Sequence, residues 1–101
     1  MTSMITNQPL KTLPPHLRKN GFNYALVLRG ERSCIYRQTV AEDLYYYEVF
    51  IIKIQPKKEF KGVVMPAKER FPHNEAFGYW AWTYRGLDKA MKKFKELEGH
   101  T

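Results

Sequence analysis

The feature that most constrains this fold is a change of hydrophobic period at Leu87. Before it, residues 78–84 read GYWAWTY, and Trp80, Trp82 and Tyr84 alternate onto one side, as in a β-strand. After it, apolar residues recur at the spacing of an amphipathic helix. That stripe consists of Leu87, Ala90, Met91, Phe94 and Leu97. The chain is therefore predicted to end in a strand followed by a helix, and the helix needs an apolar sheet face to cover.

Three earlier segments also have the pattern of strands. They are residues 22–30 (FNYALVLRG), 33–40 (SCIYRQTV) and 45–54 (YYYEVFIIKI). Short turns join them, which favours an antiparallel meander. The predicted fold class is α+β: a small antiparallel sheet, made of a three-strand meander plus a fourth strand, packed by one C-terminal helix in the order β-β-β-β-α. The 45–54 strand is apolar on both faces, so its pattern leaves open which face the helix covers.

The remaining segments frame this domain. We expect residues 1–21 to form an extended N-terminal arm, because Pro9, Pro14 and Pro15 disfavour regular structure. Residues 22–98 form the single α+β domain, interrupted by a long loop at 55–76. Loops of this length are uncommon unless they are functional or internally ordered. Within it, the run KGVVM is a candidate short strand at a sheet edge.

Composition limits the environment and the partner. The single cysteine, Cys34, cannot form an internal disulfide, which favours a reducing, cytoplasmic compartment and a role as a small core residue. No apolar run approaches membrane-spanning length, and residues 1–20 lack the features of a signal peptide. The net charge of +7 lies in the arm, the long loop and the helix, while residues 24–54 are neutral. Such a surface suits nucleic acid or another acidic partner, although a basic charge that only confers solubility remains an alternative.

Two regions could bind nucleic acid. The first is the sheet face away from the helix, with Arg29, Arg37 and Lys53 as phosphate contacts and Tyr45 and Tyr47 as stacking residues. This reading holds if Tyr46, Phe50, Ile52 and Ile54 face the helix. The same face could instead be covered by the chain's own arm and loop, or by a second subunit.

The second region is the long loop, where Lys57, Lys58 and Lys61 are the candidate contacts. A solvated loop is the alternative there. The helix lysines of DKAMKKFK could grip phosphates, but we favour a solvated helix face with Lys92 paired to Asp88 and Glu96.

No motif predicts catalysis, a metal or a cofactor. His16, His73 and His100 stand alone, and one cysteine makes no zinc site. No glycine-rich phosphate loop is present. A small metal-independent ribonuclease that uses tyrosine, arginine and lysine leaves no such motif, and it stays as a further alternative.

The stretch EAFGYWAWTYRGLDKAMKKFKEL, preceded by YYYEVFIIKI, resembles small uncharacterised proteins of bacteriophages and mobile elements, particularly of Bacteroides-type hosts. The resemblance covers roughly residues 20–98 and implies no assigned activity. The strand-then-helix ending is also similar in shape to WGR domains and AP2-like DNA-binding modules. The chain lacks the Trp-Gly-Arg signature of the first and the compact arginine-bearing triple strand of the second, so that similarity is architectural.

Our expectation is therefore a non-enzymatic, small basic protein of phage or mobile-element origin that binds nucleic acid. The alternative is a protein-interaction module, such as an inhibitor of a host enzyme or a virion component, with self-association through an apolar sheet face.

Overall fold

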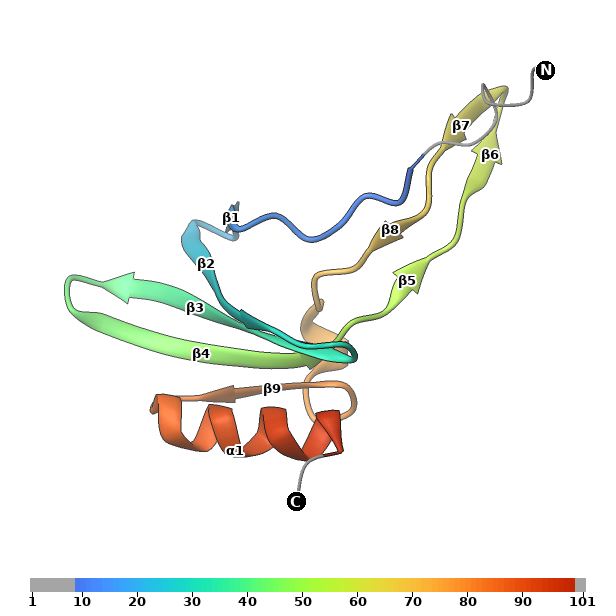
Figure 1. Cartoon of the computed structure of the whole chain (residues 1–101). Coiled ribbons are helices and arrows are strands. Elements are labelled where there is room, and N and C mark those ends of the chain that lie inside the picture. The colour runs from blue at the N-terminus through green and yellow to red at the C-terminus, as the bar shows by residue number, and fades with distance from the viewer. Residues whose placement is uncertain (1–8, 100–101) are drawn as a thin grey trace. The chain divides into compact units, whose positions relative to one another are not determined.

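The computed structural model describes residues 9–99 (Figure 1). Residues 1–8 of the predicted arm, and His100, lie outside the described residues. The described chain forms two compact units. Residues 9–13 and 53–71 make the first, and residues 14–52 and 72–99 make the second. No helix in the described part of the chain is long and apolar enough to cross a membrane.

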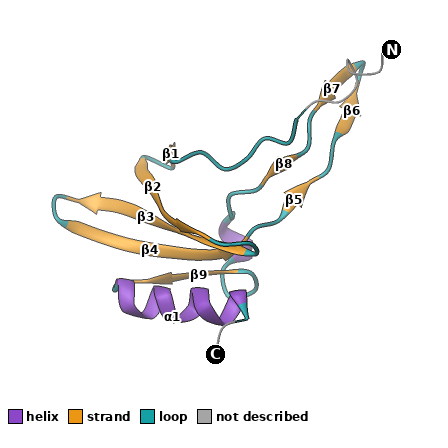
Figure 2. Ribbon diagram, viewed as in Figure 1, coloured by secondary structure: helices purple, strands orange, loops and turns teal. Residues whose placement is uncertain are grey.

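The second unit contains a five-stranded antiparallel sheet and one helix, which confirms the predicted α+β class (Figure 2). The strand order is β1-β2-β3-β4-β9. The elements are β1 (His16–Lys19), β2 (Phe22–Arg29), β3 (Ser33–Ala41), β4 (Leu44–Ile51), β9 (Ala81–Tyr84) and α1 (Leu87–Glu98). The helix begins where the hydrophobic period changes, and it ends at Gly99, whose φ of 87° is the left-handed conformation that glycine adopts readily.

Strand β1 is an addition to the predicted sheet. It pairs with β2 across a tight turn formed by Asn20 and Gly21, whose φ angles are 53° and 83°. Two consecutive positive φ angles are typical of the hairpin turn whose twist matches that of the strands, and Asn-Gly is its preferred sequence. The second part of the proline-rich segment is thus an edge strand.

Helix α1 packs on one face of the sheet over β3, β4 and β9 (Figure 1). The buried core there consists of Ile35, Val49, Ala90 and Phe94. Because Tyr47 and Val49 share one side of β4, this is the face opposite to the one with Tyr46 and Phe50. The conditional reading in which Phe50 faces the helix is therefore wrong. Both faces of β4 are apolar, so its sequence could not decide between them.

On the sheet face opposite the helix, other segments of the chain cover the part around Tyr36 and Phe50. Tyr36 and Phe50 stack there at 5.7 Å between ring centroids, and Trp80 meets Phe50 edge-on at 6.4 Å. The Tyr36 hydroxyl donates a hydrogen bond of 2.5 Å to the Pro14 carbonyl. Cys34 is fully buried, as its place in a strand predicted. Coverage by the chain's own segments is thus the arrangement found on this part of the sheet.

The last residue of helix α1, Glu98, is hydrogen-bonded to the turn that joins β2 to β3. The Glu98 carboxylate accepts hydrogen bonds from the Glu31 and Arg32 backbone N–H groups, each 2.9 Å, and from the Ser33 hydroxyl at 2.6 Å. A Cβ at Gly30 would lie 2.5 Å from the Glu98 carboxyl carbon. Glycine at position 30 therefore lets the carboxylate approach the turn.

The first unit is a β-ribbon rather than an irregular loop. Strand β5 (Ile54–Gln55) pairs with β8 (Lys68–Glu69), and β6 (Lys58–Phe60) pairs with β7 (Val63–Met65). The run KGVVM does form a strand, but in this separate ribbon and not at an edge of the five-stranded sheet. Lys61 and Gly62 make the tip, with φ angles of 51° and 80°.

Residues 11–13 hold the base of the ribbon. The Lys11 N–H donates to the Ala67 carbonyl at 3.0 Å, and the Glu69 N–H donates to the Lys11 carbonyl at 2.8 Å. The buried Glu69 carboxylate accepts a hydrogen bond of 2.8 Å from the Leu13 N–H. The base of the ribbon is thus formed by three segments of the chain, namely β5, β8 and residues 11–13, while its outer part consists of the two strands β6 and β7.

Candidate nucleic-acid interface

The outer ribbon exposes a large apolar surface. In the β6–β7 register, Phe60 pairs with Val63 and Lys58 pairs with Met65, so these four side chains share one face. Phe60 is 66% exposed and Val63 is 62% exposed. The Lys61 ammonium lies 5.3 Å from the centroid of the Phe60 ring. One face of the ribbon therefore combines apolar side chains with lysines.

The unit that contains the ribbon is also rich in basic residues, most of which are exposed. Residues 53–71 contain six bases and two acids, for a net charge of +4. Three of the predicted contact residues, Lys57, Lys58 and Lys61, are exposed on the outer ribbon. Lys53 lies at its base and is also exposed. The ribbon therefore groups the four predicted lysines in one unit.

The predicted arginines and tyrosines lie in the other unit and only partly come together. The Arg37 guanidinium lies over the Tyr45 ring, 4.5 Å from its centroid. The Arg37 Nε atom is buried and has no hydrogen-bond partner among the described residues. Beyond this pair, the Arg85 guanidinium lies 5.0 Å from the centroid of the Tyr46 ring. Because Tyr45 and Tyr46 are adjacent in β4, these two arginine–tyrosine pairs lie on opposite faces of the sheet and do not form one surface.

Two predicted site residues have different surroundings. Tyr47 packs against the helix-side core, so it is not an outward stacking residue. Arg29 pairs with Cys34 at the far end of β3, away from Arg37 in the strand register. By the β3–β4 register, Arg37, Tyr45 and Tyr47 all lie on the side of the sheet that the helix covers, so they do not share the face away from the helix on which they were predicted. Arg29 pairs with Cys34, which is opposite Phe50, so Arg29 lies on the other side.

A groove runs beside the polar side of α1. Its volume is about 270 Å³, and it is lined by Tyr84, Lys89, Lys92, Lys93 and Glu96. Lys93 is held at one wall, because its ammonium lies 4.1 Å from the centroid of the Trp82 ring and 3.7 Å from a Glu96 carboxylate oxygen. Burial, together with the charge of Glu96, raises the pKa of Tyr84. The Tyr84 hydroxyl therefore stays protonated at neutral pH and is able to donate a hydrogen bond.

A buried carboxyl lies on the sheet face opposite the helix. Glu48 is only 7% exposed, and its Oε1 atom has no hydrogen-bond partner among the described residues. Burial raises the pKa of Glu48 to about 7, against the opposing charge of Lys19. Burial and the charge of Glu48 raise the pKa of Tyr24 to about 12, and the Tyr24 hydroxyl accepts a 3.0 Å hydrogen bond from the Gln38 amide. Within this cluster, Glu48 is the group whose pKa lies near neutral, and both Glu48 and Tyr24 are buried.

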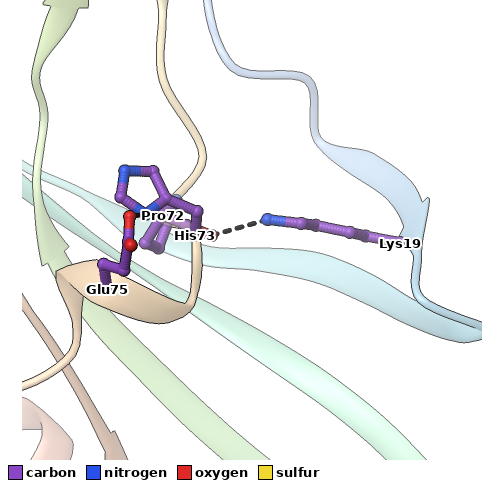
Figure 3. A network of polar contacts seen from close by, with 4 residues as sticks. All are labelled: Lys19, Pro72, His73 and Glu75. Atoms are coloured by element: carbon purple, nitrogen blue, oxygen red, sulfur yellow. Dashed lines mark hydrogen bonds and ion pairs between the residues drawn. The ribbon is translucent and has the colours of Figure 1, made fainter.

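Lys19 closes this face at one side. Its ammonium reaches from β1 to donate a hydrogen bond of 2.6 Å to the Pro72 carbonyl (Figure 3). The His73 ring follows directly, with its Nδ1 atom 3.7 Å from the Glu75 carboxylate. The short 3-10 helix η2 (Asn74–Ala76) starts there. Lys19 is thus engaged in the cover of the sheet rather than offered to a ligand.

Within residues 9–99, no three His, Cys, Asp or Glu side chains gather closely enough to hold a metal ion. The reasoning from sequence missed two features of the surface. It favoured a solvated face for the helix lysines, whereas Lys89, Lys92 and Lys93 line a groove together with Tyr84. It also missed the apolar ribbon face, for which the turn residues Lys61 and Gly62 are a weak signal. Comparison with protein-family models, with curated proteins and with solved structures found no match to this chain.

Proposed function

We propose that this chain is a non-enzymatic nucleic-acid-binding protein of phage or mobile-element origin, and that the outer ribbon β6–β7 is its principal contact. The observation that carries the proposal is the ribbon face on which Lys58 and Lys61 accompany the exposed Phe60, Val63 and Met65. The origin rests on the sequence resemblance alone.

The physical argument has two parts. A two-stranded β-ribbon has the width that the major groove of a duplex admits, and lysines at its sides reach phosphates on both strands. Apolar side chains on the same ribbon contact base edges and methyl groups, or wedge between base steps. The charge of +4 on residues 53–71 supplies the attraction that is independent of sequence.

The test compares matched charge reversals. The wild-type chain, K57E/K58E and the control R18E/K95E are titrated against a labelled duplex and a labelled single strand between about 50 mM and 200 mM salt. Arg18 and Lys95 are exposed residues outside the ribbon, and both variants lose the same net charge. We expect wild-type affinity to fall steeply with salt, and K57E/K58E to bind duplex roughly tenfold or more weakly, with a salt slope lower by about 2. Absence of wild-type binding at low salt, or equal losses in the two variants, would overturn the proposal.

A protein partner is the second candidate, and the exposed Phe60 and Val63 are the specific observation that favours it. Exposed apolar patches on small proteins commonly mark interfaces. In that case F60S reduces association, binding tolerates salt, and K57E/K58E has little effect. Size exclusion at several protein concentrations tests the version in which the partner is a second copy of the chain.

A further inference from the structure

The three lysines that line the groove beside α1 differ in the contacts that their ammonium groups make. Lys93 is already engaged by the Trp82 ring and by Glu96. Lys89 and Lys92 line the same groove, are exposed, and have no hydrogen bond, ion pair or ring contact among the described residues. The predicted pairing of Lys92 with Asp88 and Glu96 is not formed, because Glu96 pairs with Lys93 instead. Two ammonium groups therefore stay available at the groove.

The other groups that line the groove suit an anion. Among the described residues that line the groove, Glu96 is the only acid, and its ion pair with Lys93 offsets its charge. Tyr84 also lines the groove, where burial and, in addition, the nearby charge of Glu96, another lining residue, raise the pKa of its hydroxyl. A volume of about 270 Å³ lies at the small end of ligand pockets, which span roughly 300–1,000 Å³. A groove of this volume is large enough to admit a phosphate group.

We propose that this groove is a second phosphate-binding site, in which Lys89, Lys92 and the Tyr84 hydroxyl hold one phosphodiester group of a nucleic-acid strand. Lys89 and Lys92 supply charge, and Tyr84 supplies a directed hydrogen bond. Lys93 takes the role of a positioning residue, because its contact with Trp82 fixes one wall. The inference deepens the proposed function and rests on it: the ribbon contacts the duplex, and the groove adds a contact to the backbone.

The first experiment uses the full chain and the same labelled nucleic acids. K89E/K92E is compared with wild type and with the control R18E/K95E, in which Lys95 is on the same helix but does not line the groove. We expect K89E/K92E to weaken binding roughly tenfold relative to that control and to lower the salt slope by about 2. The conservative variant Y84F tests the hydroxyl and is expected to weaken binding about threefold at unchanged slope, because it removes one hydrogen bond and no charge.

A second readout does not depend on the ribbon. Because the Lys93 ammonium lies on the Trp82 ring, an anion that enters the groove changes the surroundings of that indole. Titration of W80F with inorganic phosphate is expected to shift Trp82 fluorescence, and W80F with K89E/K92E is expected to give no shift. The melting temperature of each variant reports whether it folds.

The outcomes separate the two proposals. If wild type fails to bind nucleic acid at low salt, the proposed function fails and the phosphodiester assignment fails with it. If wild type binds, K57E/K58E weakens binding and K89E/K92E behaves like the control, the groove is not a phosphate site while the proposed function stands. Loss in K89E/K92E together with the phosphate-dependent fluorescence shift supports both.

Discussion

The ribbon and the five-stranded sheet are built from similar residues and use them in opposite ways. Phe50 on β4 is fully buried beneath Trp80 and beside Tyr36, whereas Phe60 on β6 is largely exposed. Both strands pair antiparallel with one or more neighbours. The difference is a second layer: the sheet has a helix on one face and chain segments on the other, while among the residues that the structure describes none buries Phe60 or Val63 of the outer ribbon. Apolar residues there contribute little to stability, which favours a role in binding.

The largest effect is expected from a substitution in the buried core of the five-stranded sheet. F50A removes a fully buried ring from the sheet and should lower the free energy of unfolding by about 3–5 kcal/mol. Urea unfolding followed by circular dichroism measures it. F50L is the control, since it keeps most of the volume and should lose much less. A loss below about 1 kcal/mol in F50A would mean that the sheet is no better packed than the ribbon.

A smaller effect comes from the carboxyl in the sheet. Burial raises the pKa of Glu48 from 4.5 to about 7, so between these values the folded chain holds a proton that the unfolded chain has released. The stability linked to this group is therefore complete below pH 4.5 and is lost as the pH rises to about 7. E48Q should abolish that part of the dependence and should be more stable than wild type at pH 8 by roughly 1–3 kcal/mol.

Unfolding of both chains from pH 5 to pH 8 measures the difference. Subtracting the pH dependence of E48Q from that of wild type isolates the contribution of Glu48. Parallel curves for the two chains would contradict the raised pKa of Glu48.

The helix end and the β2–β3 turn should be coupled. G30A places a Cβ against the Glu98 carboxylate and displaces it, which should destabilise the chain by about 1–2 kcal/mol through the lost hydrogen bonds. E98A removes the same bonds and should have a similar effect. Because both changes act on one contact, G30A/E98A should be far less destabilised than the sum of the single variants. Additive losses would show that the turn and the carboxylate act separately.

The smallest effect is expected on the ribbon. F60S should change the free energy of unfolding by no more than ~0.5 kcal/mol, because most of the ring is already in water. The measurement is the same urea unfolding as for F50A. A loss above about 1 kcal/mol would show that Phe60 is packed, and it would weaken the argument that the ribbon face is a contact surface.

Much of the architecture could be predicted from sequence because it depends on local periodicity. The change of period at Leu87 placed the helix correctly, and the three central strands lie within a few residues of their predicted bounds. Strand β1 was not predicted, because the prolines before it favoured an extended arm over residues 1–21. The pair Asn20-Gly21 is nevertheless a strong hairpin signal. The side of β4 that meets the helix depends on tertiary packing, since Tyr46, Tyr47, Val49 and Phe50 satisfy either face.

The candidate site was harder to predict for the same reason. Lys57, Lys58 and Lys61 could be selected by charge alone, because they are adjacent in the chain. The groove joins the helix residues Lys89 and Lys92 to Tyr84 on β9, and its outline depends on how the helix rests on that strand. The surroundings of Glu48 likewise come from residues on β1, β2 and β3 that only the folded sheet brings near it.

The contact between Glu98 and the β2–β3 turn also has a kinetic meaning. It joins residues that are 65 to 67 positions apart, whereas the meander itself is built from neighbouring hairpins. Contacts of such separation form only after a large loop has closed, so the hairpins have the opportunity to assemble first. We therefore expect the hydrogen bonds of Glu98 to form late in folding, so that their loss in E98A raises the unfolding rate and leaves the folding rate nearly unchanged.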